Sequence, residues 1–217
     1  MLRLAHRGDW RRAPENTLPA LAAALAVPGC DGVEFDVRIS ADGVPVLAHD
    51  ETLERVYGRP GRIDGMTARE LEDAGVASLG DALALIPHRA MIDVDLKGLH
   101  DRAVVEVLAS GRGPGLVNGV VSSFVPETLE RIAGLAPAWP RWLNAYQLSA
   151  EKIRTAVELE CQAISVDFRE IDASSLAAVR SAGLELAAWT VRRRTTYGRL
   201  QRQGVIAACV EAAALDG

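Results

Sequence analysis

The chain has 217 residues, of which 49% are hydrophobic, 24% charged and 5% aromatic, and its net charge is −5. This composition excludes a disordered chain, which would be more polar, and a general nucleic-acid binder, which would be basic. The low aromatic content also argues against a stacking platform for single-stranded nucleic acid. Only two of the 24 basic residues are lysines, Lys97 and Lys152, so each one is of interest.

Three features bear on where the protein works. No stretch approaches about 20 uninterrupted apolar residues, so we expect no transmembrane segment. The opening residues Met1–His6 lack the apolar core and cleavage site of a signal peptide. Cys30, Cys161 and Cys209 are scattered and odd in number, which favours reduced thiols. We therefore expect a cytoplasmic protein; the sequence carries no signal for an oligomeric state.

Short apolar runs alternate with Ala- and Leu-rich amphipathic runs, a pattern typical of alternating strands and helices. In chain order we expect strands at Leu2–His6, Gly32–Arg38, Val44–Ala48, Met91–Leu96, Val117–Ser122, Arg141–Ala145, Ala163–Asp167, Leu184–Thr190 and Gly204–Val210. We expect helices between them at Thr17–Ala26, Leu79–Ile86, Asp101–Ser110, Pro126–Ala133, Ser149–Leu159, Ser174–Ala182 and Arg194–Gln203. Ser149 is a predicted N-cap, and Gly111 and Gly183 are predicted at helix C-termini.

This alternation predicts an α/β fold, a single (β/α)8 TIM barrel spanning residues 1–217. Val44–Ala48 is a second extended segment that follows the turn Ala41-Asp42-Gly43, and the other eight strands form the barrel. An open doubly wound sheet is the alternative, but the strand count and even spacing favour closure. The irregular segment Asp50–Ala77 is predicted to be a rim insertion after the second strand, with a short helix at Ala68–Asp73.

Polar residues gather where the predicted strands end, which is where a TIM barrel places its active site. The first strand ends at His6 and Arg7, and the extended segment after the second strand ends at His49. Glu34 and Asp36 are two residues apart on the second strand, so both carboxylates point to the same face. These side chains are therefore expected to converge on one rim.

The third strand adds Asp93, Asp95 and Lys97, which alternate onto one face. Clustered carboxylates repel one another unless a cation or protons intervene. An all-oxygen set suits a hard divalent ion, Mg²⁺ or Ca²⁺, so Glu34, Asp36 and Asp95 are the candidate ligands. Asp93 lies deeper on the same face and is expected to be structural.

The remaining residues of this rim complete a plausible reaction site. Arg7 and Lys97 beside a metal ion would form an anion pocket, since arginine suits bidentate phosphate contacts. His6 and His49 could act as base and acid on opposite sides of a displacement at phosphorus. Metal, phosphate clamp and acid–base pair together indicate metal-assisted phosphodiester cleavage.

The same residues stand in motifs that resemble the glycerophosphodiester phosphodiesterase family. The motifs follow one another over nearly the whole chain: His6-Arg7-Gly8, Pro14-Glu15-Asn16-Thr17, Glu34-x-Asp36, Asp42-Gly43-x-Pro45-Val46-x-x-His49-Asp50, Asp95-x-Lys97, Ser122-Ser123-Phe124 and Trp189-Thr190-Val191. The first four at these spacings are the specific ones.

The resemblance implies a TIM barrel that hydrolyses a small-molecule glycerophosphodiester to sn-glycerol 3-phosphate and an alcohol. It implies that His6 and His49 are the acid–base pair. It further implies that Glu34 and Asp36 bind the metal ion, and that two basic residues, Arg7 and Lys97, hold the phosphate.

The sequence departs from the family pattern in three places. Asp95 stands where the family usually has the longer Glu, so ligation could be direct or through water. The last strand ends Ala208-Cys209-Val210-Glu211 in place of Thr-Asp, and Arg55-Val56-Tyr57 replaces Arg-Thr-Thr. We therefore expect substrate selection to differ from that of better-known members.

Supporting roles are predicted for other residues. Glu15 is expected to orient Arg7 through an ion pair, and Asn16 is a weaker site candidate. Trp189 is expected either to contact the alcohol portion of the substrate or to pack in the barrel core. His88 and His100 are expected at ordinary surface positions.

Three other functions remain open at this stage. A lysophospholipase D-like or cyclising phosphodiesterase could use the same residues. An aldolase-type lyase could use Lys97 to form a Schiff base. The altered end of the last strand also admits a non-catalytic, anion-binding barrel.

Overall fold

The computed structural model describes residues 1–99 and 102–217. His100, predicted at the surface, and Asp101, the expected first residue of a helix, lie outside the described residues.

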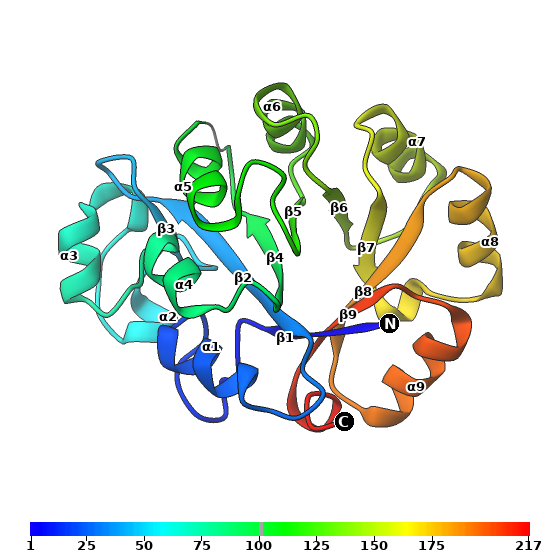
Figure 1. Cartoon of the computed structure of the whole chain (residues 1–217), viewed down its shortest axis with the longest axis horizontal. Coiled ribbons are helices and arrows are strands. Elements are labelled where there is room, and N and C mark those ends of the chain that lie inside the picture. Colours follow the sequence, from blue (N-terminus) through cyan, green and yellow to red (C-terminus); the bar gives the residue numbers. More distant parts are fainter. Residues whose placement is uncertain (100–101) are drawn as a thin grey trace.

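A closed ring of eight parallel strands forms the centre of the described structure (Figure 1). β1 (Leu2–His6) pairs with both β2 (Gly32–Ile39) and β9 (Ala207–Val210), and this double pairing closes the ring. The strands between β2 and β9 follow in the order β4 (Met91–Leu96), β5 (Gly119–Ser123), β6 (Arg141–Ala145), β7 (Ala163–Asp167) and β8 (Glu185–Val191). The predicted TIM barrel is confirmed.

Helices surround this ring and connect successive strands (Figure 1). They are α1 (Leu18–Leu25), α4 (Leu79–Leu85), α5 (Arg102–Arg112), α6 (Pro126–Leu135), α7 (Ala150–Glu158), α8 (Ala173–Ser181) and α9 (Arg194–Gln203). The Ser149 side chain accepts a hydrogen bond from the backbone N–H of Lys152, so the predicted N-cap is confirmed. Gly111 does not end its helix, because α5 continues to Arg112.

Local backbone conformation explains where two strands differ from prediction. β5 begins at Gly119 instead of Val117, because Leu116 and Asn118 form a turn with φ of 49° and 50°. β9 begins at Ala207 because Gly204 ends α9 in the left-handed conformation, with φ 80°.

The rim insertion is more ordered than the sequence predicted. β3 (Pro45–Leu47), expected as the extended segment Val44–Ala48, pairs antiparallel with β2 just before the insertion. Within the insertion, α2 (Glu54–Tyr57) and a 3₁₀ turn at Ile63–Gly65 precede the predicted helix, α3 (Ala68–Asp73). The insertion and β3 share a separate apolar cluster, formed by Val46, Ala48, Leu53, Ile63, Leu71 and Val76. The insertion lies at the end of the molecule remote from α8 (Figure 1).

The interior of the barrel has two layers of side chains. The lower layer, toward the amino ends of the strands, is apolar, and the upper layer, toward their carboxyl ends, is polar. Because alternate residues of a strand share a face, each strand contributes to both layers. The lower layer is an apolar cluster of Leu4, Val120, Trp142, Ala163, Ala187 and Ala207. The next inward residues are polar or aromatic on seven of the eight strands and a cysteine, Cys209, on β9, which places polar chemistry at the carboxyl ends of the strands.

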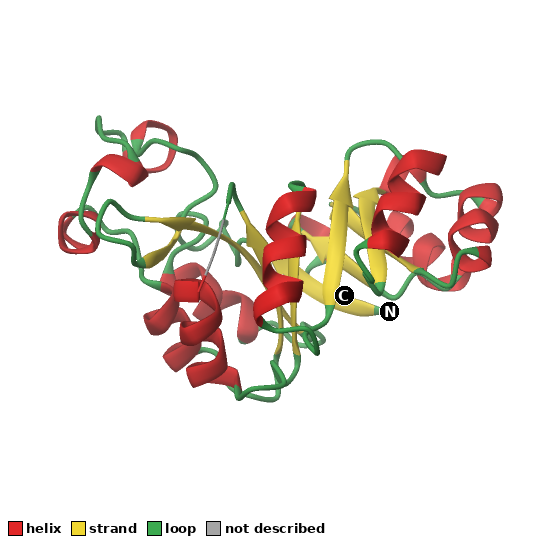
Figure 2. Ribbon diagram, turned by 90° about the horizontal axis from the view of Figure 1, so that it is seen from above, coloured by secondary structure: helices red, strands yellow, loops and turns green. Residues whose placement is uncertain are grey.

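The two chain termini lie close together in both views (Figures 1 and 2). This proximity follows from the pairing of β1 with β9, in which Ala5 lies opposite Val210. The closure brings the ends of the first and last strands, more than 200 residues apart, to one side of the barrel mouth.

Candidate active site

The register of β2 and β4 places four carboxylates side by side. Glu34 lies opposite Asp93, and Asp36 lies opposite Asp95. Each residue is at most 5% exposed. Four adjacent carboxylates removed from water are unfavourable unless cations or protons neutralise them, so this arrangement requires compensation.

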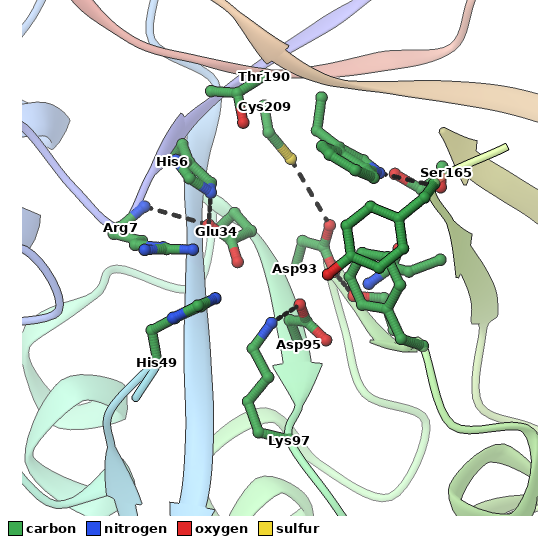
Figure 3. A pocket seen from close by; sticks show the side chains of 15 residues that line it. His6, Arg7, Glu34, His49, Asp93, Asp95, Lys97, Ser165, Thr190 and Cys209 are labelled. Atoms are coloured by element: carbon green, nitrogen blue, oxygen red, sulfur yellow. Dashed lines mark hydrogen bonds and ion pairs between the residues drawn. The ribbon is translucent and has the colours of Figure 1, made fainter. Parts of the chain in front are cut away.

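A cavity of about 190 Å³ opens over these carboxylates (Figure 3). Seven predicted site residues line it: His6, Arg7, Glu34, His49, Asp95, Lys97 and Trp189. Three others, Glu15, Asn16 and Asp36, are outside its lining. Glu15 and the backbone N–H of Asn16 contact Arg7, and Asp36 contacts Lys97. In Figure 3, Arg7 is drawn between the two histidines, and Asp95 and Lys97 face them.

Glu34, Asp36 and Asp95 form a group that could hold a metal ion. Each offers a carboxylate oxygen, and these oxygens all lie within 4.8 Å of one another. Within the described residues, Oδ1 of Asp95 is buried and has no hydrogen-bond partner. Burial and repulsion from Asp36 raise the pKa of Glu34 well above its usual value. A divalent cation would satisfy the orphaned oxygen and the excess negative charge, so the donor set fits a divalent metal.

Lys97 provides part of the missing positive charge. Its ammonium lies 2.9 Å from Oδ1 of Asp36 and also pairs with Asp95. Burial lowers the pKa of Lys97, but the two carboxylates raise it by more, so the amine stays protonated. A Schiff-base lysine must be neutral to attack a carbonyl. The geometry therefore opposes the lyase alternative.

Arg7 is held in an unusual conformation beside the carboxylates. Its φ is 57°, in the left-handed region, and its backbone N–H donates to the main-chain oxygen of Glu34 at 2.8 Å. Its Nε lies 2.9 Å from Oδ2 of Asp36, and its Nη1 lies 2.8 Å from Oε1 of Glu15, so the expected pair with Glu15 is present. Gly8 must follow, because a Cβ there would lie 2.6 Å from the backbone of Ala20.

Asn16 forms two hydrogen bonds with Asp36, one of the four clustered carboxylates. Its Nδ2 donates to Oδ2 of Asp36 at 2.8 Å, and its Oδ1 accepts the backbone N–H of Asp36 at 3.1 Å. Burial raises the pKa of Asp36, but Lys97 and Arg7 lower it by more, so this carboxylate is ionised. Asn16 therefore fixes an anionic side chain.

Asp93 lies on the floor of the cavity. Ser122 Oγ donates to its Oδ1 at 2.6 Å, and the Cys209 thiol lies 3.9 Å from its Oδ2. Burial raises the pKa of Asp93 to about 7, so this carboxyl holds its proton far more tightly than an exposed aspartate does. It lies outside the group of three carboxylates that could bind a metal ion.

His6 is fixed by a residue that sequence reasoning had not assigned to the site. Its Nδ1 lies 2.6 Å from Oε1 of Glu211, and its Nε2 lies 3.9 Å from Oε2 of Glu34. Arg192 Nε donates to the other Glu211 oxygen at 2.7 Å. The Glu211 side chain is 7% exposed. The signal that could have found it was its place at the end of the last strand, which barrel closure brings beside the first.

His49 has the same arrangement on the insertion side. Its Nδ1 lies 2.7 Å from Oδ1 of Asp50, and Arg55 Nε donates to Oδ2 of Asp50 at 2.5 Å. Burial lowers the pKa of His49, against the opposing effects of Asp36 and Asp50. A carboxylate on Nδ1 fixes the ring and leaves Nε2 for proton transfer. Both candidate histidines thus present Nε2 to the cavity.

Three aromatic rings form the opposite wall. Phe124 stacks on Tyr146 with centroids 4.7 Å apart, and Trp189 meets each ring edge-on at 5.6 Å. Trp189 Nε1 donates to the main-chain oxygen of Ser165, and Tyr146 is 72% exposed. Trp189 is therefore part of a cavity wall at the barrel mouth, which fits contact with an organic portion of a ligand.

Comparison with known proteins connects this site to one family. Residues 6–92 match the model of the glycerophosphoryl diester phosphodiesterase family. Glycerophosphodiester phosphodiesterase of Caldanaerobacter subterraneus is 26% identical over 224 residues, covering 93% of this chain and 90% of that protein. Human glycerophosphodiester phosphodiesterase 1 is 34% identical over 148 residues, covering 59% of this chain and 44% of that protein. The match thus spans less than half of the human relative.

Solved structures show the same fold. A phosphodiesterase from Oleispira antarctica, solved with its product sn-glycerol-3-phosphate, matches with a TM-score of 0.86 and 26% identity, covering 97% of this chain and 92% of that one. A glycerophosphodiester phosphodiesterase from Agrobacterium tumefaciens matches with a TM-score of 0.84 and 27% identity, covering 100% of this chain and 98% of that one.

Across residues 1–99 and 102–217, no helix combines the length and the hydropathy that a bilayer-spanning segment needs.

Proposed function

We propose that the chain is a member of the glycerophosphodiester phosphodiesterase family and that it hydrolyses a glycerophosphodiester to sn-glycerol 3-phosphate and an alcohol. The observation that supports this most strongly is that two carboxylate-fixed histidines line one cavity together with Glu34 and Asp95, two of the three carboxylates that could hold a metal ion. Arg7 and Lys97 add positive charge in the same cavity.

The two histidines would move the protons. One Nε2 takes the proton of the attacking oxygen, and the other donates a proton to the leaving alkoxide as the P–O bond breaks. Glu211 and Asp50 would stabilise the positive charge that each ring carries during its step. The attacking oxygen is water or the 2-hydroxyl of the glycerol moiety, and the second choice forms a cyclic phosphate first.

The charged side chains would bind and orient the phosphate. Arg7 can present its fork to two phosphate oxygens, whereas the compact ammonium of Lys97 fits the space between Asp36 and Asp95. Glu34, Asp36 and Asp95 would hold a divalent ion, for which Mg²⁺ and Ca²⁺ are the candidates because all the donors are oxygens. When bound, such an ion polarises the phosphoryl group and offsets developing negative charge.

The alternatives can be separated by substrate. The exposed Tyr146 and its two aromatic neighbours favour one second candidate, a lysophospholipase D-like activity on a lipid diester. The non-catalytic barrel has less support, because the altered last strand supplies Glu211 to His6.

We place the reaction in the cytoplasm, in keeping with three free cysteines.

Product release from four phosphodiesters tests the proposal, with glycerol 3-phosphate measured for the glycerophosphodiesters and choline measured for the lipid. Glycerophosphocholine, glycerophosphoethanolamine, glycerophosphoglycerol and lysophosphatidylcholine would be supplied with Mg²⁺, with Ca²⁺ or with EDTA. We expect turnover of at least one glycerophosphodiester with a metal ion and loss of turnover in EDTA. Turnover of the lipid alone would replace the proposal with the second candidate, and turnover of none would refute both.

A further inference from the structure

We propose that Arg55, on the rim insertion, is a positioning residue for two site residues at once, Arg7 and His49. It acts through two carboxylates, Glu15 and Asp50. Arg55 itself is outside the lining of the cavity, so its effect is indirect. The proposal deepens the function proposed above and rests on it for the roles of the two site residues.

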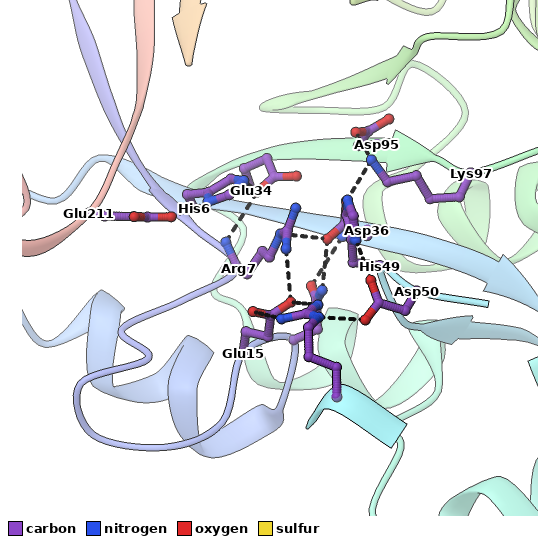
Figure 4. A network of polar contacts seen from close by, with 12 residues as sticks. His6, Arg7, Glu15, Glu34, Asp36, His49, Asp50, Asp95, Lys97 and Glu211 are labelled. Carbon is purple, nitrogen blue, oxygen red and sulfur yellow. Dashed lines mark hydrogen bonds and ion pairs between the residues drawn. The ribbon is translucent and has the colours of Figure 1, made fainter. Parts of the chain in front are cut away.

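The first arm runs from Arg55 through Glu15 to Arg7, and Figure 4 labels the last two of these residues. Arg55 Nη1 lies 2.8 Å from Oε2 of Glu15, and Arg55 Nη2 lies 2.7 Å from Oε1, which is a bidentate pair. The same Oε1 accepts from Arg7 Nη1 at 2.8 Å. Glu15 is thus fixed between two guanidinium groups, and its position sets the direction of the Arg7 fork.

The second arm runs from Arg55 through Asp50 to His49, and Asp50 and His49 are labelled in Figure 4. Arg55 Nε lies 2.5 Å from Oδ2 of Asp50, and Oδ1 of Asp50 lies 2.7 Å from Nδ1 of His49. Asp50 therefore bridges a guanidinium and an imidazole. All three side-chain nitrogens of Arg55 are used, two on one carboxylate and one on the other.

The geometry requires an arginine. A lysine ammonium is a point charge on a flexible stem and cannot meet three acceptors in the plane of a guanidinium. Glu15 follows the first strand, Asp50 follows β3, and Arg55 lies on α2, so one side chain joins three segments. Leu53, fully buried in the apolar cluster of the insertion, is two residues before Arg55 and anchors that segment.

The chain offers a matched control on the same insertion. Arg62 also pairs with two carboxylates, Glu51 and Asp64, and its side chain is 54% exposed, against 49% for Arg55. Neither Glu51 nor Asp64 lines the described cavity. Exposed ion pairs contribute little to folding stability, so substitution of either arginine should leave the protein folded.

Kinetics of four variants test the proposal on the glycerophosphodiester that the wild type turns over best. Arg55→Gln should lower kcat and raise KM, with kcat/KM falling about 100-fold, because an angstrom of misplacement costs that much. Glu15→Gln should act mainly on KM and Asp50→Asn mainly on kcat, since each breaks one arm. Arg62→Gln should match the wild type.

A second measurement is independent of turnover. The chain has four histidines, so imidazole ¹⁵N NMR can follow His49, with His49→Gln for assignment. Its signal should change in Arg55→Gln and remain unchanged in Arg62→Gln, with both variants melting at the same temperature.

The outcomes separate the two proposals. An inactive wild type refutes the proposed function, whereas the NMR comparison still decides the positioning role. Equal kinetics and equal His49 signals in Arg55→Gln and Arg62→Gln would overturn the positioning role. Full recovery of activity by Arg55→Lys would also overturn it, because charge alone would then suffice.

Discussion

The His6 side of the cavity is built by adjacent barrel strands, whereas the His49 side is built by the rim insertion. Both sides place a carboxylate on Nδ1 and an arginine behind that carboxylate. Glu211 is 7% exposed at the closure of the barrel, but Asp50 is 26% exposed on the rim. The same chemical arrangement thus rests on the closure of the barrel at His6 and on an inserted segment at His49, with different consequences for stability.

The largest expected effect comes from removing the metal ion, which both sides share. EDTA should lower kcat at least about 100-fold, and added Mg²⁺ or Ca²⁺ should restore it. Because the pKa of Glu34 is raised, protons compete with the ion, so metal affinity should fall as the pH falls. Calorimetric titration at two pH values checks this sign. Affinity that rises at low pH would contradict it.

Glu211→Gln and Asp50→Asn compare the two sides directly. Each should lower kcat about 10- to 100-fold, as loss of a partner that orients a functional histidine does. Only Glu211→Gln should also lower the melting temperature clearly, because its carboxylate is buried and bonded to both His6 and Arg192. Equal loss of stability in the two variants would remove the distinction between closure and insertion.

Lys97→Arg should have a smaller effect, a decrease in kcat/KM of about 10-fold despite the retained charge. The larger guanidinium must fit where the ammonium pairs with both Asp36 and Asp95. Lys152→Arg, on helix α7, is the control and should behave as the wild type. Wild-type kinetics in Lys97→Arg would show that charge alone matters at this position.

The smallest expected effect is a shift of the pH–rate profile, and it concerns only the His49 side of the cavity. Burial lowers the pKa of His49, and Asp50 opposes that shift. Asp50→Asn removes the opposing anion, so the pKa should fall further and the limb of the pH–rate profile due to His49 should move to lower pH. Asp64→Asn, on the same insertion, should leave the profile unchanged. Movement to higher pH would contradict the argument.

Local sequence pattern was enough to predict much of the barrel. β1, β4, β6 and β7 match their predicted bounds, because each is a short apolar run bounded by turn signals. The alternation of carboxylates on β2 and β4 likewise predicted that Glu34, Asp36 and Asp95 would meet. Periodicity of two fixes the face to which a side chain points, so these contacts could be read from spacing.

Contacts between distant segments were not predictable in this way. Glu211 meets His6 only because the ring closes. In the sequence, Glu211 stands in a segment that lacks the Thr-Asp of the family pattern, so it was not assigned to the site. Arg55 lies in an insertion whose helix α2 has four residues, too short for a periodic signal. Its partners Glu15 and Asp50 come from two other segments, so the ion-pair network depends on the tertiary fold.

The most direct test of the account is a comparison of His6→Ala, His49→Ala and the double variant in steady-state hydrolysis of the preferred glycerophosphodiester. Each single substitution should lower kcat about 100- to 10,000-fold. The double variant should be little worse than either single one, because the two rings serve one reaction. A wild-type rate in either single variant, with the fold retained by circular dichroism, would contradict the account.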